Sequence, residues 1–276
     1  MSDGRLVLVG TPIGNLADLS PRAVEALSGA DVVACEDTRR TGRLLQHAGI
    51  RAHALVAVND HTESRWVPDL LGRLDRGEVV AVVTDAGMPG ISDPGERLVR
   101  AAASAGHRVE VVPGPSAVVA GLVVSGLATG RFCFEGFLPR KGSARTERLA
   151  ALGGERRTIV LYEAPHRLRR TLDDLAGALG VERRCVLARE LTKLHEEVWR
   201  GTLGRAVAHA SEVEPRGEYV LVVDGAPAPP GPDDDELRGA LRGALAEGLS
   251  TRDAVARVVE RTGSPRRHVY TLANDL

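Results

Sequence analysis

Charged residues gather in three runs, each directly after a short apolar stretch. The runs are EDTRR at residues 36–40, EAPHR at 163–167 and RELTK at 189–193. Carboxylates and imidazoles in such positions could take a proton from a substrate, and arginines could bind an anion. The end of a buried strand is a common place for catalytic residues, but it is also where a chain returns to solvent.

Three turns rich in glycine and proline also follow apolar stretches, at residues 10–15, 84–93 and 113–116. Glycine lets a backbone approach a ligand closely, and α/β sheets bind ligands beyond the carboxyl ends of their strands. None of these turns has the GxGxxG or GxxxxGK[ST] pattern of a phosphate loop, which argues against a nucleoside triphosphatase. One turn alone would indicate only a tight connection. Three together favour a shared cleft, and we expect residues 84–95 to seat a small-molecule cofactor.

The elements that must position these residues alternate between strand and helix patterns. Apolar β-branched runs predict strands at 6–9, 32–35, 54–58, 79–83 and 108–112. Helices are expected between them: one from Ser20 and Pro21 to Gly29, two at 39–47 and 66–76, and one from Asp93 and Pro94 to Gly106. This alternation is the βαβ signature of a parallel sheet.

The second half of the chain predicts a more mixed α/β unit. An apolar helix follows Ser116, and strands are expected at 158–162, 185–188 and 219–223. Helices are expected at 144–152 and 167–179, and the segments 132–138 and 197–203 are left without an assigned structure. The predicted organisation is two α/β domains, 1–113 and 114–226.

A proline-rich and then acidic linker at 227–235 precedes a helical appendage at 236–276. Helical patterns cover 236–246, 251–261 and 265–272, with Ser250 capping the second helix and Ser264 with Pro265 starting the third. The short turn between the last two resembles a helix-turn-helix. The alternative is an appendage that packs on the body or on a dimer partner.

Composition sets broad limits on function. The 276 residues are 43% hydrophobic and 26% charged, as in ordinary folded proteins, and the formal net charge of -1 neither announces nor excludes nucleic-acid binding. Cys35, Cys133 and Cys185 lack CxxC spacing, so we expect core cysteines, no metal site and a reducing compartment. The apolar run 117–128 is too short to span a membrane, and no leader pattern is visible at the N-terminus. A cytoplasmic location without membrane partners is expected.

Seven segments carry a resemblance that spans residues 6–223. They are VGTPIGNLADLSPRA, CEDTRRTGRLLQH, VTDAGMPGISDPG, VPGPSA, GFLPRKG, YEAPHRL and ARELTKLHEE. The chain thereby resembles the bacterial ribosomal RNA small subunit methyltransferase I family of the tetrapyrrole methylase superfamily. One departure is NDHTES at 59–64, where the family pattern has histidine, asparagine and glutamate; His61 and Glu63 are given no catalytic role.

The resemblance implies an S-adenosylmethionine-dependent methyltransferase that modifies the 2′-hydroxyl of a cytidine in the decoding region of 16S rRNA. It also implies a homodimer, a cofactor cleft between the two α/β domains and a helix-turn-helix-like appendage. The cofactor would be held by a set of small and loop residues. These are Pro12, Asp85, Ala86, Gly87, Met88, Ile91, Ser92, Ser116, Ala117, Ala164 and Leu191.

Methyl transfer to a hydroxyl requires in-line positioning and a place for the hydroxyl proton. The candidate bases are Glu36, Asp37, Glu163 and His166, of which Glu163 and His166 are preferred because they lie beside a loop that the family places at the cofactor. Contacts to RNA phosphates are expected from five cations. These are Arg39, Arg40, Arg140, Lys141 and Arg145.

Two other functions are compatible with parts of the sequence. A sister enzyme that methylates a carbon of a porphyrin or corrin precursor would share fold and cofactor, but residues 36–40, 163–167, the GFLPRK segment and the appendage resemble the RNA branch. A non-catalytic regulator that binds nucleic acid through the C-terminal helices would leave the α/β body without a role. DNA is therefore not expected as a partner.

Overall fold

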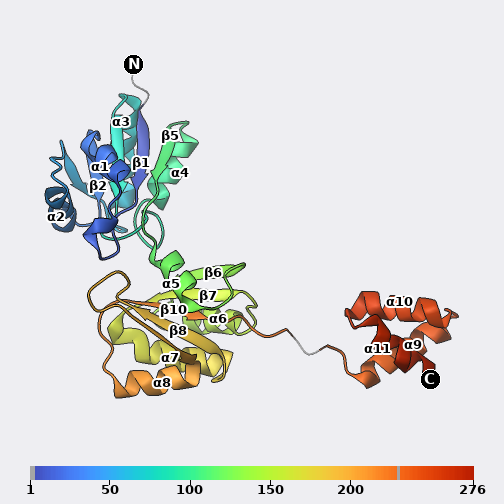
Figure 1. Ribbon diagram of the computed structural model, residues 1–276. Coiled ribbons are helices and arrows are strands. Elements are labelled where there is room, and N and C mark those ends of the chain that lie inside the picture. Colours follow the sequence, from blue (N-terminus) through green and yellow to red (C-terminus); the bar gives the residue numbers. More distant parts are fainter. Residues whose placement is uncertain (1–3, 229–230) are drawn as a thin grey trace. The chain divides into compact units, whose positions relative to one another are not determined.

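The first sheet consists of five parallel strands with the order β3-β2-β4-β1-β5 (Figure 1). The computed structural model describes residues 4–228 and 231–276. The strands are β1 (Arg5–Val9), β2 (Val32–Cys35), β3 (Leu55–Ala57), β4 (Val79–Val83) and β5 (Arg108–Val112). Helices cover both faces of the sheet, so β2 and β4 are buried and apolar along nearly their whole length. The predicted βαβ alternation is confirmed.

Two pairs of helices cover the first sheet. On one face, α1 (Pro21–Ser28) and α2 (Thr38–His47) contribute Leu27 and Leu45 to a core with β1 and β2. On the other face, α3 (Glu63–Asp75) and α4 (Glu96–Ser104) contribute Leu70 and Leu98 to a second core. We call β1 to β5 with these helices the first lobe.

A buried carboxylate links two helices whose starts differ from prediction. Helix α3 begins at Glu63, three residues before the expected start, and α4 begins at Glu96 rather than at Asp93. The Glu63 side chain is 4% exposed, and its Oε1 accepts hydrogen bonds from the backbone N–H groups of Gly95 and Leu98, at 3.1 and 3.0 Å. A carboxylate at a helix N-terminus satisfies free N–H groups and the helix dipole. Glu63 therefore caps α4 from another element.

The second sheet is mixed, as expected, with the order β6-β7-β10-β8-β9. Its strands are β6 (Phe132–Phe137), β7 (Thr158–Glu163), β8 (Arg184–Arg189), β9 (Glu197–Thr202) and β10 (Tyr219–Val223). Only β6 and β7 are parallel; β10 runs antiparallel to both β7 and β8. The start of β10 therefore lies beside the ends of β7 and β8.

Helices cover the second sheet unequally. Helix α5 (Ala117–Ser125) packs on one face, and α6 (Ser143–Gly153), α7 (Pro165–Leu179) and α8 (Leu203–Glu212) belong to the core on the other. Helix α8 was not predicted. Its signals are a Thr202 cap, whose side chain accepts a hydrogen bond from the Arg205 N–H, and buried Leu203, Ala206 and Ala210. We call α5 to β10 the second lobe.

The three cysteines carry no disulfide. Cys35 and Cys185 are buried, and Cys133 is half-buried.

The C-terminal residues 227–276 form a separate compact unit. It contains α9 (Asp234–Ala246), α10 (Thr251–Thr262) and α11 (Arg266–Asn274), which share a small core of their own. Ser250 caps α10 as predicted, and α10 ends at Gly263 with a φ of 68°. Pro265, not Ser264, occupies the N-cap of α11. Two residues of the predicted linker, 229 and 230, lie outside the described residues.

The α/β fold class is thus confirmed, while the division into pieces at 113, 226 and 235 stays a proposal. In the described ranges no helix has the length and apolar character needed to cross a membrane.

The ends of β1 and β5 approach each other very closely. The Gly10 N–H donates to the Val112 carbonyl at 2.9 Å, and a methyl group built on Gly114 would lie 2.8 Å from the Cα atom of Gly10. Only hydrogen atoms fit between these backbones, so both positions require glycine.

We predict that Gly114→Ala lowers the free energy of unfolding by about 2–3 kcal/mol, because the added methyl group must push the Gly10 backbone away. Gly42→Ala is the matched control. A methyl group at Gly42, within α2, meets no atom within 4 Å, so alanine should raise stability by up to about 1 kcal/mol. Chemical denaturation measures both, and equal effects would contradict the close approach.

Candidate active site

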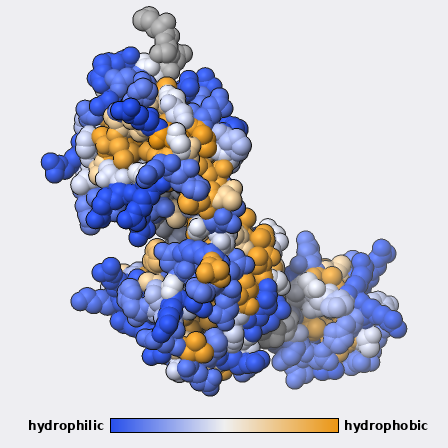
Figure 2. Space-filling model, turned by 60° about the vertical axis from the view of Figure 1, so that its left-hand side comes forward, coloured by the Kyte–Doolittle hydropathy of each residue, from blue (hydrophilic) through white to orange (hydrophobic). Residues whose placement is uncertain are grey.

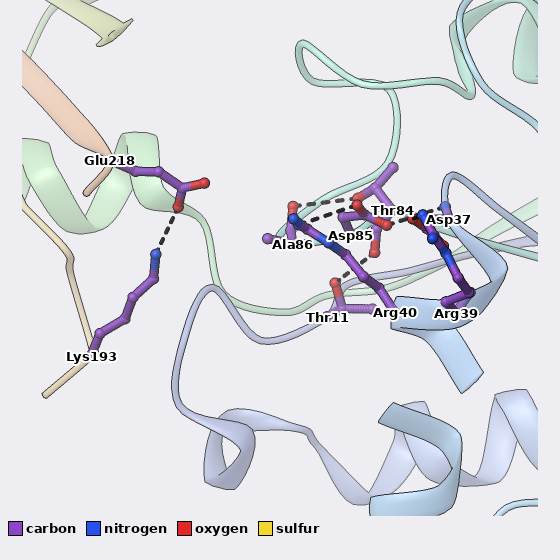
Figure 3. Close-up of polar contacts among 9 residues, drawn as sticks. All are labelled: Thr11, Asp37, Arg39, Arg40, Thr84, Asp85, Ala86, Lys193 and Glu218. Atoms are coloured by element: carbon purple, nitrogen blue, oxygen red, sulfur yellow. Dashed lines mark hydrogen bonds and ion pairs between the residues drawn. The ribbon is translucent and has the colours of Figure 1, made fainter. Parts of the chain in front are cut away.

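The turns after β1 and β4 are fastened to each other at the carboxyl end of the first sheet. The Thr11 N–H donates to the Gly87 carbonyl at 2.9 Å, and the Gly87 N–H returns a bond to Thr11 at 3.2 Å. The buried Thr11 hydroxyl donates to the Thr84 carbonyl at 3.2 Å (Figure 3). The predicted ligand turns are therefore one structural unit.

A cavity of about 260 Å³ lies where this unit meets the second lobe. All of the residues expected to hold a cofactor line it, except Pro12 and Asp85. Those that do are Ala86, Gly87, Met88, Ile91, Ser92, Ser116, Ala117, Ala164 and Leu191. Pro12 and Asp85 line a neighbouring depression together with Arg40 and Arg43.

The second lobe contributes further lining that sequence reasoning missed. It comprises Phe137, Tyr162, Ala188, Glu190, Lys193, Glu218, Tyr219 and Val220, to which the first lobe adds Ile13 and Asp93. Phe137, Tyr162, Glu190 and Lys193 belong to segments noticed in the sequence. Glu218 and Tyr219 could be found only from the antiparallel direction of β10, which the apolar pattern of that strand does not reveal.

Backbone strain gathers at this cavity. Ser92 and Glu190, which line it, have φ angles of 61° and 49°, and Thr192 has 66°. These left-handed conformations are costly for side chains with a Cβ atom and persist where surrounding contacts hold them. The Thr192 hydroxyl accepts a hydrogen bond from the Asn15 N–H at 3.1 Å, so one strained residue also ties the two lobes together.

Most charged groups of the second-lobe wall neutralise one another. Lys193 Nζ lies 2.9 Å from Glu190 Oε1. It also lies 2.7 Å from Glu218 Oε2, a contact that Figure 3 shows. Burial by itself would raise the pKa of Glu190, but hydrogen bonds from the Glu218 N–H and from Lys193 outweigh it and lower the pKa. This trio is a satisfied ionic network.

The Glu163 carboxylate, one of the preferred candidate bases, is buried, and both of its oxygens have hydrogen-bond or ion-pair partners. Its side chain has no exposed surface; Oε1 lies 3.2 Å from Arg167 Nε and accepts from the Ala164 N–H at 2.9 Å. Oε2 accepts from the Thr171 hydroxyl at 2.5 Å. His166, the other preferred candidate, is exposed and does not line the cavity. The structure therefore does not bring this pair together in one pocket.

The other two candidates, Glu36 and Asp37, differ in their availability. Asp37 caps α2 and binds Arg39, and this side-chain hydrogen bond is the main reason that its pKa is lowered to about 2. Burial and the nearby Asp85 raise the pKa of Glu36. Asp85 accepts a hydrogen bond from the Asp37 N–H at 3.2 Å and pairs with Arg40 at 3.3 Å (Figure 3).

A second, basic pocket lies at the start of α7. It is lined by Arg140, Arg145, His166, Arg167, Arg170 and Thr171. Arg145 is 4% exposed, and its three nitrogens donate to Asp174, the Pro139 carbonyl and Thr171, so it retains little capacity to contact RNA and instead fixes the preceding loop.

The other expected RNA contacts are solvent-exposed. Arg140 and Lys141 have no ion-pair partner in the part of the chain that the structure describes, whereas Arg39 and Arg40 are held in pairs with acids. Over the same described residues, no cluster of acidic, histidine or cysteine side chains could hold a metal ion.

We predict that Glu163→Gln lowers the free energy of unfolding by about 2–4 kcal/mol, because it leaves the half-buried Arg167 guanidinium without its counterion. The matched control is Glu96→Gln in the exposed pair of Glu96 with Arg100, which should change stability by less than about 0.5 kcal/mol. Thermal and denaturant unfolding compare the two. A small effect at Glu163 would show that its buried pair contributes little.

Comparisons with known proteins agree with this geometry. Residues 5–207 match the family described as Tetrapyrrole (Corrin/Porphyrin) Methylases, and residues 231–276 match the RsmI C-terminal HTH domain. Among solved structures, uroporphyrin-III-C-methyltransferase from Thermus thermophilus shares 25% identity with a TM-score of 0.57, covering 80% of this chain and 94% of that one. Diphthine synthase, at 17% identity and a TM-score of 0.63 over 80% and 90% of the two chains, shows the fold alone.

Curated relatives match over nearly the whole chain. A protein of Synechocystis named Ribosomal RNA small subunit methyltransferase I is 49% identical, covering 99% of this chain and 98% of its own. The proteins of that name in Escherichia coli O157:H7 and Mycobacterium tuberculosis CDC 1551 are 44% and 47% identical, over 99% and 98% of this chain and 95% and 94% of theirs. The chain belongs to the ribosomal RNA small subunit methyltransferase I family, within the tetrapyrrole methylases.

Proposed function

We propose that this protein transfers the methyl group of S-adenosylmethionine to the 2′-hydroxyl of a cytidine in 16S rRNA of the small ribosomal subunit. The observation that carries the proposal is the cavity in which segments of both lobes converge, lined by the residues that the family resemblance assigns to the cofactor. Relatives named for ribosomal RNA methylation and spanning nearly the whole chain support the substrate class.

The residues of the cavity fit this cofactor. Ala86, Ser116 and Ala117 are small, so backbone can approach a ligand closely, while Ile13 and Leu191 offer apolar surface for an adenine ring. When bound, the cofactor supplies an electrophilic methyl group. The chain must hold the hydroxyl in line with that group, exclude water and accept one proton.

We infer that RNA contacts this protein next to the cofactor cavity. The junction between β7 and α7 joins the cavity to the basic pocket: Glu163 and Ala164 line the cavity, while His166 and Arg167 line the pocket. In this arrangement the buried Glu163 carboxylate holds the second-lobe wall of the cavity in place, and the exposed His166 side chain faces the bound RNA. The GFLPRK segment places unpaired Arg140 at the same pocket, where phosphate binding would orient the ribose.

Neither alternative accounts for all of these features. A methyltransferase for tetrapyrrole carbons would need neither the basic pocket nor the C-terminal unit. A non-catalytic regulator would leave the methylase lobes and their strained cavity without a role. For the C-terminal helices we propose a contribution to engaging the ribosomal subunit.

A homodimer and a cytoplasmic location complete the proposal. Helix α5 is apolar almost all round, and its Val119 and Val123 side chains are 52% and 62% exposed. The edge strands β5 and β6 add the exposed side chains of Val111 and Phe137. Figure 2 shows hydrophobic surface gathered between hydrophilic regions on one face of the molecule. Apolar surface of this kind favours a second copy as its partner.

The reaction is tested with small subunits isolated from a strain that lacks this protein. The wild-type chain should transfer labelled methyl to one cytidine ribose, which nuclease mapping identifies. Ala86→Phe should abolish transfer and weaken binding of S-adenosylhomocysteine at least about tenfold, because Ala86 is exposed and lines the cavity. Ala103→Phe, at an exposed position of α4, is the control and should leave both unchanged. Label in protein or in another nucleotide would contradict the proposed substrate.

RNA binding through the basic pocket has its own test. The double substitution Arg140→Ala with Lys141→Ala should weaken binding to small subunits and reduce the slope of log affinity against log salt by about one to two, since each phosphate contact releases counterions. Arg100→Ala, an exposed arginine of α4 that pairs with Glu96, is the control. Unchanged affinity and slope in the double variant would place the RNA elsewhere.

A further inference from the structure

Four carboxylates line the cofactor cavity, and one of them has no partner among residues 4–228 and 231–276. They are Asp93, Glu163, Glu190 and Glu218. Glu163 pairs with Arg167, and Glu190 and Glu218 share Lys193. Asp93 makes no hydrogen bond or ion pair with any side chain or backbone group in the described residues. Keeping a half-buried carboxylate ionised without a hydrogen-bond donor costs free energy. We therefore expect the Asp93 carboxylate to bind either a ligand group or a proton.

The backbone holds Asp93 firmly in place. On one side Ser92 is kept in a left-handed conformation, and on the other the Gly90 N–H donates to the Pro94 carbonyl at 3.0 Å. Glu63 anchors the following turn through the Gly95 N–H at 3.1 Å. The carboxylate is thus positioned by its surroundings although nothing neutralises it.

The groups around Asp93 all favour proton uptake. Glu36 follows β2, Asp85 follows β4 and Asp60 precedes α3; burial, and then these three acids, raise the pKa of Asp93 to about 7. Tyr162 on β7 also interacts with Asp93, and its own pKa is raised to about 12, mainly by burial, so it stays protonated. The other titratable groups that line the cavity are Glu163, Glu190, Lys193, Glu218 and Tyr219. Arg40 pairs with Asp85, but no cation in the described chain lowers the pKa of Asp93 itself.

We propose that Asp93 is the general base of the methyl transfer, the group that takes the proton of the ribose hydroxyl. This inference rests on the proposed function. An ordinary carboxylate is too weakly basic for this purpose, whereas a base whose pKa lies near the working pH combines availability with proton affinity. Burial and the cluster of acids around Asp93 provide that condition without a histidine.

The step balances as follows. The hydroxyl proton moves to the Asp93 carboxylate while the ribose oxygen forms a bond to the methyl carbon. The bond from that carbon to sulfur breaks, and its electron pair stays on the sulfur. The products are a methyl ether, a neutral thioether and a protonated Asp93, which returns its proton to solvent.

The test compares full-length Asp93→Asn with the wild type in three measurements. Calorimetry measures binding of S-adenosylhomocysteine, infrared titration follows the protonated carboxyl band, and single-turnover assays follow methyl transfer to small subunits against pH. We expect affinity within about threefold of the wild type, loss of the carboxyl that titrates near pH 7, and a rate at least about a hundredfold lower. Asp173→Asn, at an exposed position of α7, is the control and should match the wild type.

A second variant checks the electrostatic environment. Asp60→Asn removes one of the charges that raise the pKa of Asp93, so the acid limb of the wild-type pH profile should move to lower pH. In Asp93→Asn that limb should be missing. An unmoved limb would overturn the assignment.

Other outcomes also decide. Unchanged methyl transfer in Asp93→Asn would overturn the proposal, and so would a tenfold loss of S-adenosylhomocysteine affinity, which would make Asp93 a cofactor ligand. If the wild type transfers no methyl to small subunits, the proposed function fails instead. The infrared titration still reports the Asp93 carboxyl in that case.

Discussion

The backbones of Gly10 and Gly114 touch without side chains between them, and the geometry of the cavity follows from this contact. It brings the ends of β1 and β5 together. The turn after β4 is then drawn in through the paired N–H and carbonyl groups of Thr11 and Gly87. Three loops far apart in sequence thereby become one rigid wall, which positions a reacting methyl group better than mobile loops could.

The carboxylates of this region divide according to what neutralises them. Glu63 is satisfied by two helix N–H groups, Glu163 by an arginine and a threonine, and Glu190 by a lysine. These groups hold the elements in place. Asp93, by contrast, is surrounded by other acids and has no neutralising partner in the described chain. The strained residue Ser92 directly precedes it. Proteins commonly place such unfavourable features at functional sites.

Sequence reasoning was most successful where local pattern decides structure. The apolar runs of β2 and β4 and the Ser20 cap of α1 predict their elements to within a residue. It failed where a distant partner decides, because Glu63 caps the start of α4 from another element. Helix α8 was missed although its Thr202 cap and its buried face of Leu203, Ala206 and Ala210 are local signals. The cofactor wall was predicted through family segments. The environment of Asp93 was not, because it depends on Glu36, Asp60 and Asp85, acids from three separate loops that only the folded chain brings together.

The chain passes between the lobes only once, through the short connection from β5 to α5. All five strands of the first sheet, with their covering helices, precede this crossing. During synthesis from the N-terminus, the first lobe therefore has every one of its sheet partners before the second lobe has been made. The cavity is different, because its last contributors, Glu218 to Val220, emerge late. The nascent protein can thus acquire a folded half long before it acquires affinity for its cofactor, and cofactor binding cannot assist the early folding steps.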